Sequence, residues 1–255
     1  MKKVSILMTC FNAERFIKRS IKSALNQKFK NYEIIIVDDG SSDKSPKIIN
    51  NFKNNKLKKF FLKKNTGRTK ALNFGLRQCR GKYIAVLDAD DISANNRIVT
   101  QFNFLEKNKD IDLVASYYKI KFIDKKVTKY MKFESVKKLT KELCSINLIA
   151  HSSVMFRNAI IKKYKIYNED YKYAQDYEMI LKVLKRGKLD YIPRYLTTVF
   201  IDNNNMTNSL KYKKIIILDR IKLLIFSITK LNLSFSRTIY NLIIVIVLSI
   251  KYILV

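Results

Sequence analysis

Tryptophan is absent from this 255-residue chain, and histidine and cysteine are scarce, with one and three copies. The cysteines Cys10, Cys79 and Cys144 are odd in number and lack the spacing of a disulfide framework or a zinc site. We therefore expect reduced cysteines in a cytosolic protein. Because histidine and cysteine are so few, a metal site would be built from oxygen ligands, which favour Mg²⁺ or Mn²⁺ over zinc.

Glycine-rich phosphate loops are also missing. The chain has only five glycines; no GxGxxG follows the first expected strand, and no GxxxxGKS/T occurs anywhere. Neither a dinucleotide-binding fold nor a P-loop is therefore indicated. No helix-turn-helix, RRM or zinc pattern is visible, which disfavours the common nucleic-acid-binding modules.

Acidic residues are outnumbered, with 21 Asp and Glu against 51 Lys and Arg, for a net charge of +30. This charge favours an anionic partner such as a nucleotide, a nucleic acid or a membrane surface. Lys, Asn and Ile are abundant throughout, as in an A/T-rich coding background, so charge alone identifies no partner. At 47% hydrophobic residues, the chain has the composition of a folded protein with one sizeable core.

The most informative stretch is residues 81–91, GKYIAVLDADD. Its continuous apolar run predicts a strand at 83–87 that is buried on both faces, as in a parallel sheet. Asp88, Asp90 and Asp91 follow directly, and such crowded carboxylates repel one another unless a cation neutralises them. The stretch therefore indicates a metal site, although a polar loop that caps the next helix would have a similar composition.

Strands and helices alternate along the first part of the chain. Strands are expected at 4–9, 33–37, 58–62 and 83–87, and helices from Asn12, from Pro46 and after Gly67. This order predicts a parallel sheet with right-handed crossovers. Since Asp38 and Asp39 end the second strand, two acidic clusters should meet at one edge of that sheet.

Four segments in this order carry a resemblance to a known family. They are VSILMTCFNAERFIKRSIKSALNQ, YEIIIVDDGSSDKS, NTGRTKALNFGL and GKYIAVLDADD. Together they resemble the inverting family 2 glycosyltransferases of bacterial surface-polysaccharide type, clearly over residues 1–95 and more loosely to about 200. The resemblance implies a GT-A fold at 1–205, Rossmann-like and mainly parallel, with a nucleotide-sugar half at 1–95 and an acceptor half at 96–205. The composition of the remaining residues, 206–255, predicts a helical tail.

The resemblance also implies a nucleotide-sugar site. Its residues would be Thr9, Phe11, Asp38, Asp39, Arg68, Asp88 and Asp90. Asp39 would face the uracil, Asp88 would lie near the ribose, and Asp90 would bind the Mn²⁺ or Mg²⁺ that bridges the diphosphate. Phe11 stands where many relatives have Tyr, so stacking on the base is kept and a hydroxyl contact is lost.

The second half would hold the acceptor. Residues 125–149 form a basic segment that is expected to be an acceptor-side loop with a helix at 135–143, and 151–156 resemble the strand at the floor of the acceptor site. His151 fits either a buried core histidine or an acceptor-site residue. Gln175 and Asp176 resemble the family's Glu-Asp motif, in which Asp176 would be the general base. A carboxylate favoured by the helix dipole is the alternative for Asp176.

The tail has a different character. From Met206 onward the only acidic residue is Asp219, and residues 239–250 are almost wholly apolar. A helix is expected at 215–228, followed by either a packing helix, an interfacial anchor or a short span. We expect peripheral contact with an anionic membrane at the cytoplasmic face of the inner membrane.

The sequence thus predicts a UDP-sugar-dependent hexosyl- or N-acetylhexosaminyltransferase. Its acceptor would be a saccharide or a lipid-linked acceptor in lipopolysaccharide, O-antigen or capsule synthesis. A metal-dependent nucleotidyltransferase is the first alternative, although no glycine-rich loop supports it. A basic nucleic-acid-binding protein or nuclease is the second, and it would leave the VDDGSSD turn unexplained.

Overall fold

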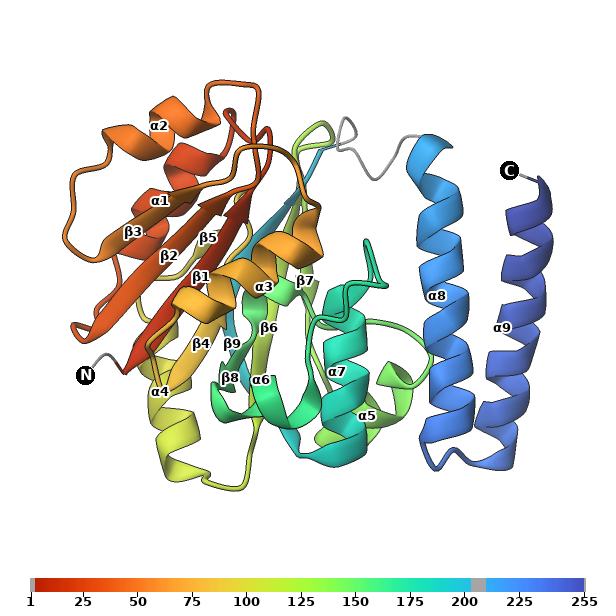
Figure 1. Ribbon diagram of the computed structural model, residues 1–255. Helices are drawn as coiled ribbons and strands as arrows, with labels where there is room; N and C mark the ends of the chain where they lie inside the picture. The colour runs from red at the N-terminus through yellow and green to blue at the C-terminus, as the bar shows by residue number, and fades with distance from the viewer. Residues whose placement is uncertain (1–2, 203–209, 255) are drawn as a thin grey trace.

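One sheet runs through the computed structural model, which describes residues 3–202 and 210–254 (Figure 1). Within these residues the strand order is β3-β2-β1-β4-β8-β6-β9-β5, with β7 beside β6. The strands are β1 (Val4–Cys10), β2 (Tyr32–Asp38), β3 (Leu57–Phe61), β4 (Tyr83–Val86), β5 (Ile92–Ser93), β6 (Leu113–Phe122), β7 (Val127–Met131), β8 (Met155–Arg157) and β9 (Leu189–Ile201).

Most strands point the same way. β1 pairs in parallel with β2 and β4, β2 with β3, and β6 with β9. β8 lies antiparallel between β4 and β6, so β6 keeps the direction of β4. The expected mainly parallel sheet is confirmed.

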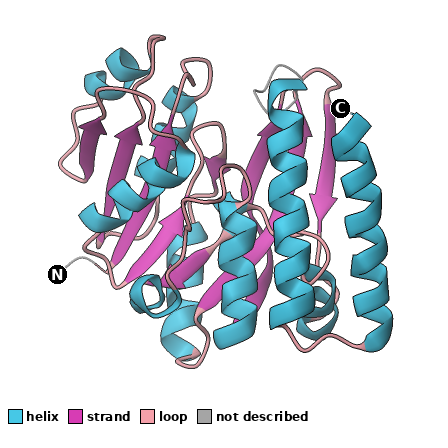
Figure 2. Cartoon of the chain, turned by 45° about the vertical axis from the view of Figure 1, so that its right-hand side comes forward, coloured by secondary structure: helices cyan, strands magenta, loops and turns pink. Residues whose placement is uncertain are grey.

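Helices cover both faces of this sheet (Figure 2). They are α1 (Ile17–Leu25), α2 (Ser45–Asn51), α3 (Arg68–Gln78), α4 (Arg97–Lys107), α5 (Val136–Leu143), α6 (Ala159–Tyr164), α7 (Gln175–Arg186), α8 (Leu210–Lys230) and α9 (Phe235–Leu254). Residues of α1, α2 and α4 join one buried cluster, and residues of α3, α5, α6 and α7 join another.

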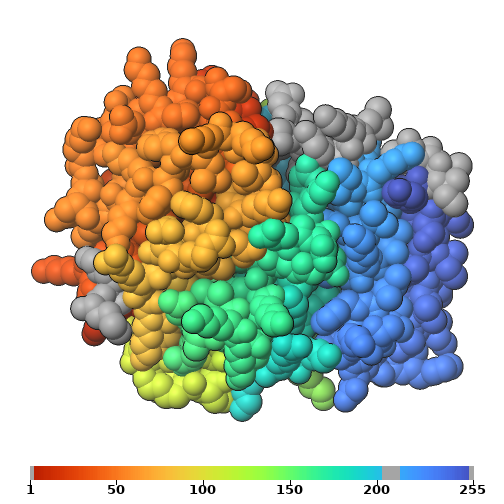
Figure 3. Space-filling model, viewed as in Figure 1, coloured from red at the N-terminus to blue at the C-terminus, as the bar shows by residue number. Residues whose placement is uncertain are grey.

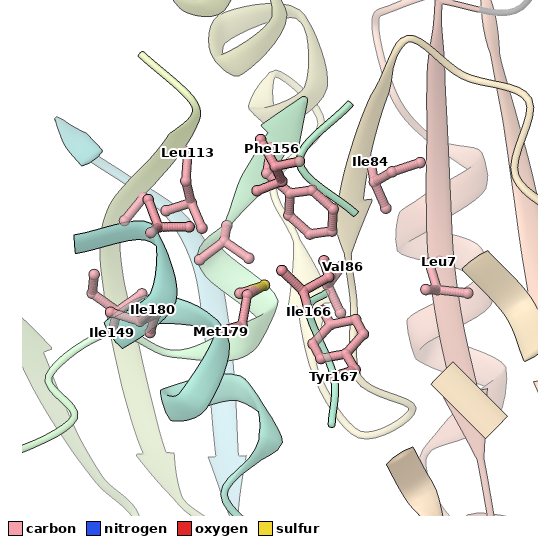
Figure 4. Packing of buried hydrophobic residues seen from close by; sticks show 14 of the residues in the cluster. Leu7, Ile84, Val86, Leu113, Ile149, Phe156, Ile166, Tyr167, Met179 and Ile180 are labelled. Carbon is pink, nitrogen blue, oxygen red and sulfur yellow. The ribbon is translucent and has the colours of Figure 1, made fainter. Parts of the chain in front are cut away.

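The two clusters follow from the pleat of the strands. Leu7 of β1 belongs to the cluster on the α3 side, whereas Ile6 and Met8 belong to the cluster on the α1 side. Strands covered on both faces need apolar residues at every position, which explains their continuous apolar runs. Figure 4 shows how Phe156 of β8, Val86 of β4 and Met179 of α7 meet in the cluster on the α3 side.

The helix expected from Asn12 is present as α1, but its expected start is wrong, because α1 begins only at Ile17. Asn12 has a left-handed φ of +48°, and its side-chain oxygen accepts a hydrogen bond of 2.9 Å from the Ser42 N–H. Its own N–H donates to Ser41 Oγ at 2.9 Å. The polar loop after β2 therefore holds residues 12–15 in a non-helical conformation.

The expected strand at 151–156 is also wrong in part. Residues His151–Ser153 form a 3-10 turn, and β8 begins only at Met155. The turn allows Ser152 Oγ to accept a hydrogen bond of 2.9 Å from the Asp88 N–H. The acidic loop after β4 thus determines where this strand can begin.

The C-terminal helices lie side by side on the α7 side of the molecule (Figures 1 and 3). Leu223 of α8 packs against Tyr177 and Leu181 of α7, so the expected helix at 215–228 is part of a longer helix that covers the core. The expected boundary at 205/206 lies outside the described residues. Within the described residues, only Phe235–Tyr252 of α9 is long and apolar enough to cross a membrane.

Candidate active site

The two acidic clusters lie at one edge of the sheet, as expected. Cys10 pairs with Asp38 in the β1–β2 register, and Leu7 pairs with Val86 in the β1–β4 register. Because all three strands are parallel, their carboxyl ends face the same side. Asp38 and Asp88 therefore flank the end of β1.

Asp38 and Asp39 hold loops in place. Asp38 accepts hydrogen bonds from the N–H and Oγ of Ser41, at 2.9 and 2.7 Å. Asp39 accepts from the Thr66 N–H and Oγ1, at 2.8 and 2.7 Å, and from the Gly67 N–H at 2.9 Å. Asp39 thereby fixes the turn that begins α3. The predicted contact of Asp39 with a base would use the lone pairs that these bonds leave free.

Arg68, the first residue of α3, points toward the acidic loop after β4. Its Nη2 donates to Asp88 Oδ1 at 2.6 Å and lies 3.3 Å from His151 Nδ1. Burial opposes ionisation of Asp88, but the charge of Arg68 and the nearby imidazole of His151 hold its pKa well below the usual range. In turn, although burial opposes it, the charges of Asp88 and Asp176 raise the pKa of Arg68.

His151 is both buried and part of the site. It is 5% exposed, its Nε2 lies 2.7 Å from the Tyr167 hydroxyl, and its Nδ1 lies 3.6 Å from Asp88 Oδ1. The tautomer decides whether Nδ1 accepts a hydrogen bond from Arg68. Tyr167, which the sequence did not single out, adopts a left-handed φ of +58°. Such conformations are uncommon for large side chains and concentrate at functional sites.

Asp90 and Asp91 show the repulsion between neighbouring carboxylates that the sequence predicted. Burial and the charge of Asp88 raise the pKa of Asp90 to about 6. Burial and the charges of Asp90 and Asp88 raise the pKa of Asp91 well above its ordinary value. Asp91 is 3% exposed, and its Oδ1 accepts a hydrogen bond of 3.1 Å from the Phe200 N–H. A cation near Asp90 would relieve this repulsion.

The oxygen ligands suit a hard divalent cation, but they are few. Among the described residues, no group of three His, Cys, Asp or Glu side chains is arranged to hold a metal. Asp90, with Asp88 beside it, could supply carboxylate oxygens, and a bound diphosphate and water would have to complete the shell. Mg²⁺ and Mn²⁺ tolerate such sharing of ligands with a substrate.

A cavity of about 170 Å³ lies next to these carboxylates. It is lined by Arg68, Asp88, Asp91, Ala150, His151, Tyr173, Gln175, Asp176 and Val199. Five predicted site residues thus line one cavity, although they come from α3, the β4 loop, the 3-10 turn and α7. Thr9, Phe11, Asp38, Asp39 and Asp90 do not line it. Asp91 belongs to the acidic stretch that the sequence singled out, whereas Tyr173 and Val199 were missed because nothing in their local sequence marks them.

Asp176 and Gln175 begin α7 at the wall of this cavity. Asp176 Oδ2 accepts a hydrogen bond of 3.1 Å from Asn147 Nδ2, and its place in the first helical turn suits a carboxylate. Gln175 is 1% exposed, and within the described part of the chain its Oε1 has no hydrogen-bond partner. A buried acceptor without a donor is costly, so this amide is suited to a donor from a ligand.

Comparison with known sequences places these residues in context. Residues 5–165 match the model of the family described as Glycosyl transferase family 2. An uncharacterized glycosyltransferase of Methanocaldococcus jannaschii is 36% identical over 227 residues, which cover 83% of this chain and 76% of that protein. Another from Haemophilus influenzae is 33% identical over 201 residues, covering 78% of each.

Solved structures with the same architecture are more distant in sequence. Staphylococcus aureus TarS 1–349 in complex with UDP-GlcNAc has a TM-score of 0.73 and 19% identity, over 95% of this chain and 70% of that chain. The mannosyltransferase PcManGT from Pyrobaculum calidifontis in complex with GDP-Man and Mn²⁺ has a TM-score of 0.71 and 13% identity, over 95% and 69%. At these identities the likeness concerns the fold, and it confirms the expected GT-A architecture.

Proposed function

The chain belongs to glycosyl transferase family 2, and on this premise we propose that it transfers a sugar from a UDP-sugar to an acceptor hydroxyl with inversion. The observation that carries the proposal is the cavity in which Arg68, Asp88 and Asp176 lie together. A leaving diphosphate needs positive charge, and an acceptor hydroxyl needs a base. Both kinds of group line the same space. The family assignment disfavours the nucleotidyltransferase and nuclease alternatives.

The donor would lie across the carboxyl ends of β1, β2 and β4. In this pose Thr9, Phe11 and Asp39 would contact the nucleoside, and Arg68 would approach the diphosphate. Support comes from the bonds of Asp39 to Thr66 and Gly67, which bring the start of α3 to the end of β2. Structural neighbours bind UDP-GlcNAc or GDP-Man, which supports a nucleotide-sugar donor, here a hexose or N-acetylhexosamine donor.

A divalent cation would be held by Asp90, with Asp88 beside it. When bound, Mn²⁺ or Mg²⁺ would neutralise the charge that develops on the leaving diphosphate. The raised pKa of Asp90 supports this assignment, because a carboxylate repelled by its neighbours gains most from a cation. Arg68 would complement the same negative charge with its guanidinium donors.

Asp176 would take the proton from the acceptor hydroxyl as that oxygen attacks. One base on the face opposite the leaving group gives inversion in a single displacement. Asn147 orients the carboxylate through Oδ2, which leaves Oδ1 for the hydroxyl. Gln175 and His151 would contact the acceptor, which we expect to be a saccharide or lipid-linked intermediate of surface-polysaccharide synthesis.

We further propose that α9 rests on an anionic membrane at the cytoplasmic face. Its outward stripe is more than 40% exposed and consists of Ile239, Leu242, Ile243, Ile246, Val247 and Ile250. The opposite face is occupied, because Leu248 packs with Ile217 and Leu224 of α8. Asn241 is buried and donates to the Cys144 carbonyl at 2.9 Å. A helix fixed on one side and apolar on the other suits the membrane interface.

The test is an assay of nucleotide release across a panel of UDP- and GDP-sugars with Mn²⁺ or Mg²⁺. Saccharide and lipid-linked acceptors are supplied in parallel, and product stereochemistry is read by NMR. We expect one UDP-sugar to be consumed only with an acceptor and the metal, with inversion at the sugar carbon. Consumption of GDP-sugars alone, or retention, would contradict the donor or the mechanism.

A further inference from the structure

A second and larger pocket lies on the other side of β9 from the candidate active site. Its volume is about 450 Å³, and four cationic side chains line it: Arg15, Arg19, Lys121 and Lys126. Arg15 Nη1 is paired with Asp202 Oδ2 at 2.7 Å. In the described part of the chain no carboxylate lies within 4.0 Å of the charged groups of Arg19, Lys121 or Lys126. The pocket therefore keeps an excess of positive charge.

Apolar side chains complete the lining of this pocket. They include Phe16, Phe122 and Phe200, with Ile123 and Val127 beside them. The guanidinium of Arg19 stacks on the Phe200 ring, 3.6 Å from its centre. Within the described residues, the buried Nε of Arg19 has no hydrogen-bond partner. Cations beside rings suit a ligand with an anionic group on a carbon skeleton, and guanidinium groups prefer phosphate or carboxylate oxygens.

The two cavities share a wall. Successive side chains of a strand point to opposite faces, so Val199 of β9 lines the active-site cavity while Phe200 lines the second pocket. The Phe200 N–H donates to Asp91 Oδ1, and Arg19 Nη2 donates to the Asp90 carbonyl at 2.8 Å. A ligand that contacts Arg19 would therefore bind a residue that is hydrogen-bonded to the loop that carries the predicted metal ligand.

We propose that this second pocket binds a phosphate ester, namely the phosphorylated part of the acceptor. The phosphate would pair with Arg19, Lys121 and Lys126, and the carbon part of the ester would contact the phenylalanine rings. That the ester belongs to the acceptor rests on the proposed function, whereas the binding of the ester does not. The pocket would favour acceptors that carry phosphate over neutral saccharides.

The experiment is calorimetric titration of the full chain with hexyl phosphate and, separately, with inorganic phosphate. Each titration is done without and with UDP and Mn²⁺. We expect one hexyl phosphate per chain, bound at least about tenfold more tightly than inorganic phosphate because of the apolar lining. We expect UDP to leave this affinity unchanged. Equal affinity for inorganic phosphate would contradict the proposal that the pocket binds a phosphate ester. Competition by UDP would show that the pocket is part of the donor site.

Matched charge-reversal variants distinguish binding in the pocket from attraction to the overall positive charge of the chain. The variant K121E/K126E should lose at least about tenfold in hexyl phosphate affinity. The control K125E/K132E changes two nearby exposed cations that do not line the pocket, so it should stay within about twofold. Both lysines of the pocket are exposed, which keeps the fold intact. Equal losses in both variants would overturn the site. Absence of UDP binding in the unmodified chain would instead contradict the proposed function alone.

Discussion

Arg68 lies near two carboxylates that are far apart in the sequence, Asp88 after β4 and Asp176 at the start of α7. It pairs with Asp88 at 2.6 Å, and the charge of Asp176 also raises its pKa. A donor diphosphate would compete with Asp88 for this guanidinium, since Arg binds both groups in the same planar geometry. Once Arg68 turned to the phosphate, Asp88 and Asp90 would both need another cation. The predicted metal would supply it.

Asp90 is the residue that would depend most on that metal. We expect Asp90→Ala to abolish turnover and to weaken UDP binding in the presence of Mn²⁺, measured by calorimetry. The free energy of unfolding should not fall, because the change removes repulsion from Asp88. Asp110→Ala serves as control, since Asp110 is exposed and pairs with Lys188. Turnover of Asp90→Ala at the unmodified rate would remove Asp90 from the metal site.

A second prediction concerns Asp176 as the proposed general base. Asp176→Asn keeps the size of the side chain but cannot accept a proton, so we expect a rate loss of roughly 10²- to 10⁴-fold. UDP affinity should stay within about twofold, because this carboxylate lies on the acceptor side. Asp170→Asn is a nearby exposed control. A near-normal rate would move the role elsewhere, first to His151, which lines the same cavity.

At the scale of elements, one buried carboxylate joins the N-terminal strands. Glu33 of β2 accepts hydrogen bonds from Ser5 Oγ of β1 at 2.8 Å, from Lys58 Nζ of β3 at 2.7 Å and from the Arg80 N–H at 2.7 Å. Burial would raise its pKa, but these donors outweigh burial and lower it below the ordinary value. Glu33 therefore links β1, β2 and β3 at the N-terminal side of the sheet.

The pH dependence of stability should report this carboxylate. Because its pKa is lowered on folding, its contribution is present above the unfolded pKa and is lost as pH falls through the folded pKa. We expect Glu33→Gln to lower the free energy of unfolding at pH 7 by about 1.5–3 kcal/mol. The deficit should shrink below about pH 4.3. Urea unfolding of Glu33→Gln and of the exposed control Glu134→Gln measures this. A pH-independent deficit would contradict the ionic role.

At the scale of the whole molecule, α9 turns an apolar stripe away from the protein. The α8–α9 pair forms one side of the molecule, remote from α1 and α2 (Figure 3). In addition to its apolar packing on α8, helix α9 is attached by specific polar contacts. Asn241 and Arg237 form hydrogen bonds with Ser145, which follows α5, at 2.6 and 3.1 Å. The stripe is thus held in a fixed orientation relative to the cavity. An acceptor embedded in a membrane could then be presented at a defined height.

We expect the full chain to sediment with anionic vesicles and to be only partly released by high salt. Basic residues contribute about 1 kcal/mol each and are screened by salt, whereas the apolar stripe is not. The variant I243S/I246S should be released completely at high salt. The control V136S/I146S changes two exposed apolar residues outside α9. If the unmodified chain stays in the supernatant at low salt, α9 is a packing helix only, and the glycosyltransferase assignment is unaffected.

The sequence by itself determined the fold class and the family. Continuous apolar runs at 4–9, 33–37 and 83–87 require strands covered on both faces, and alternation with helices makes them parallel. Parallel strands bring their carboxyl ends to one edge, so the placement of Asp38 and Asp88 at the same edge followed from local pattern alone. The same pattern placed Arg68 at the start of a helix after Gly67.

Only the tertiary structure decided which side chains line the cavities and contact one another. Tyr173 and Val199 join the cavity, and Tyr167 supports His151, although contacts across many residues leave no periodic trace in the sequence. The start of α1 at Ile17 and the 3-10 turn at 151–153 arose because hydrogen bonds from distant loops outweighed local helix and strand propensities. Likewise, the opposite directions of Val199 and Phe200 created two cavities from one strand. Such features depend on which segments lie side by side, which local pattern does not specify.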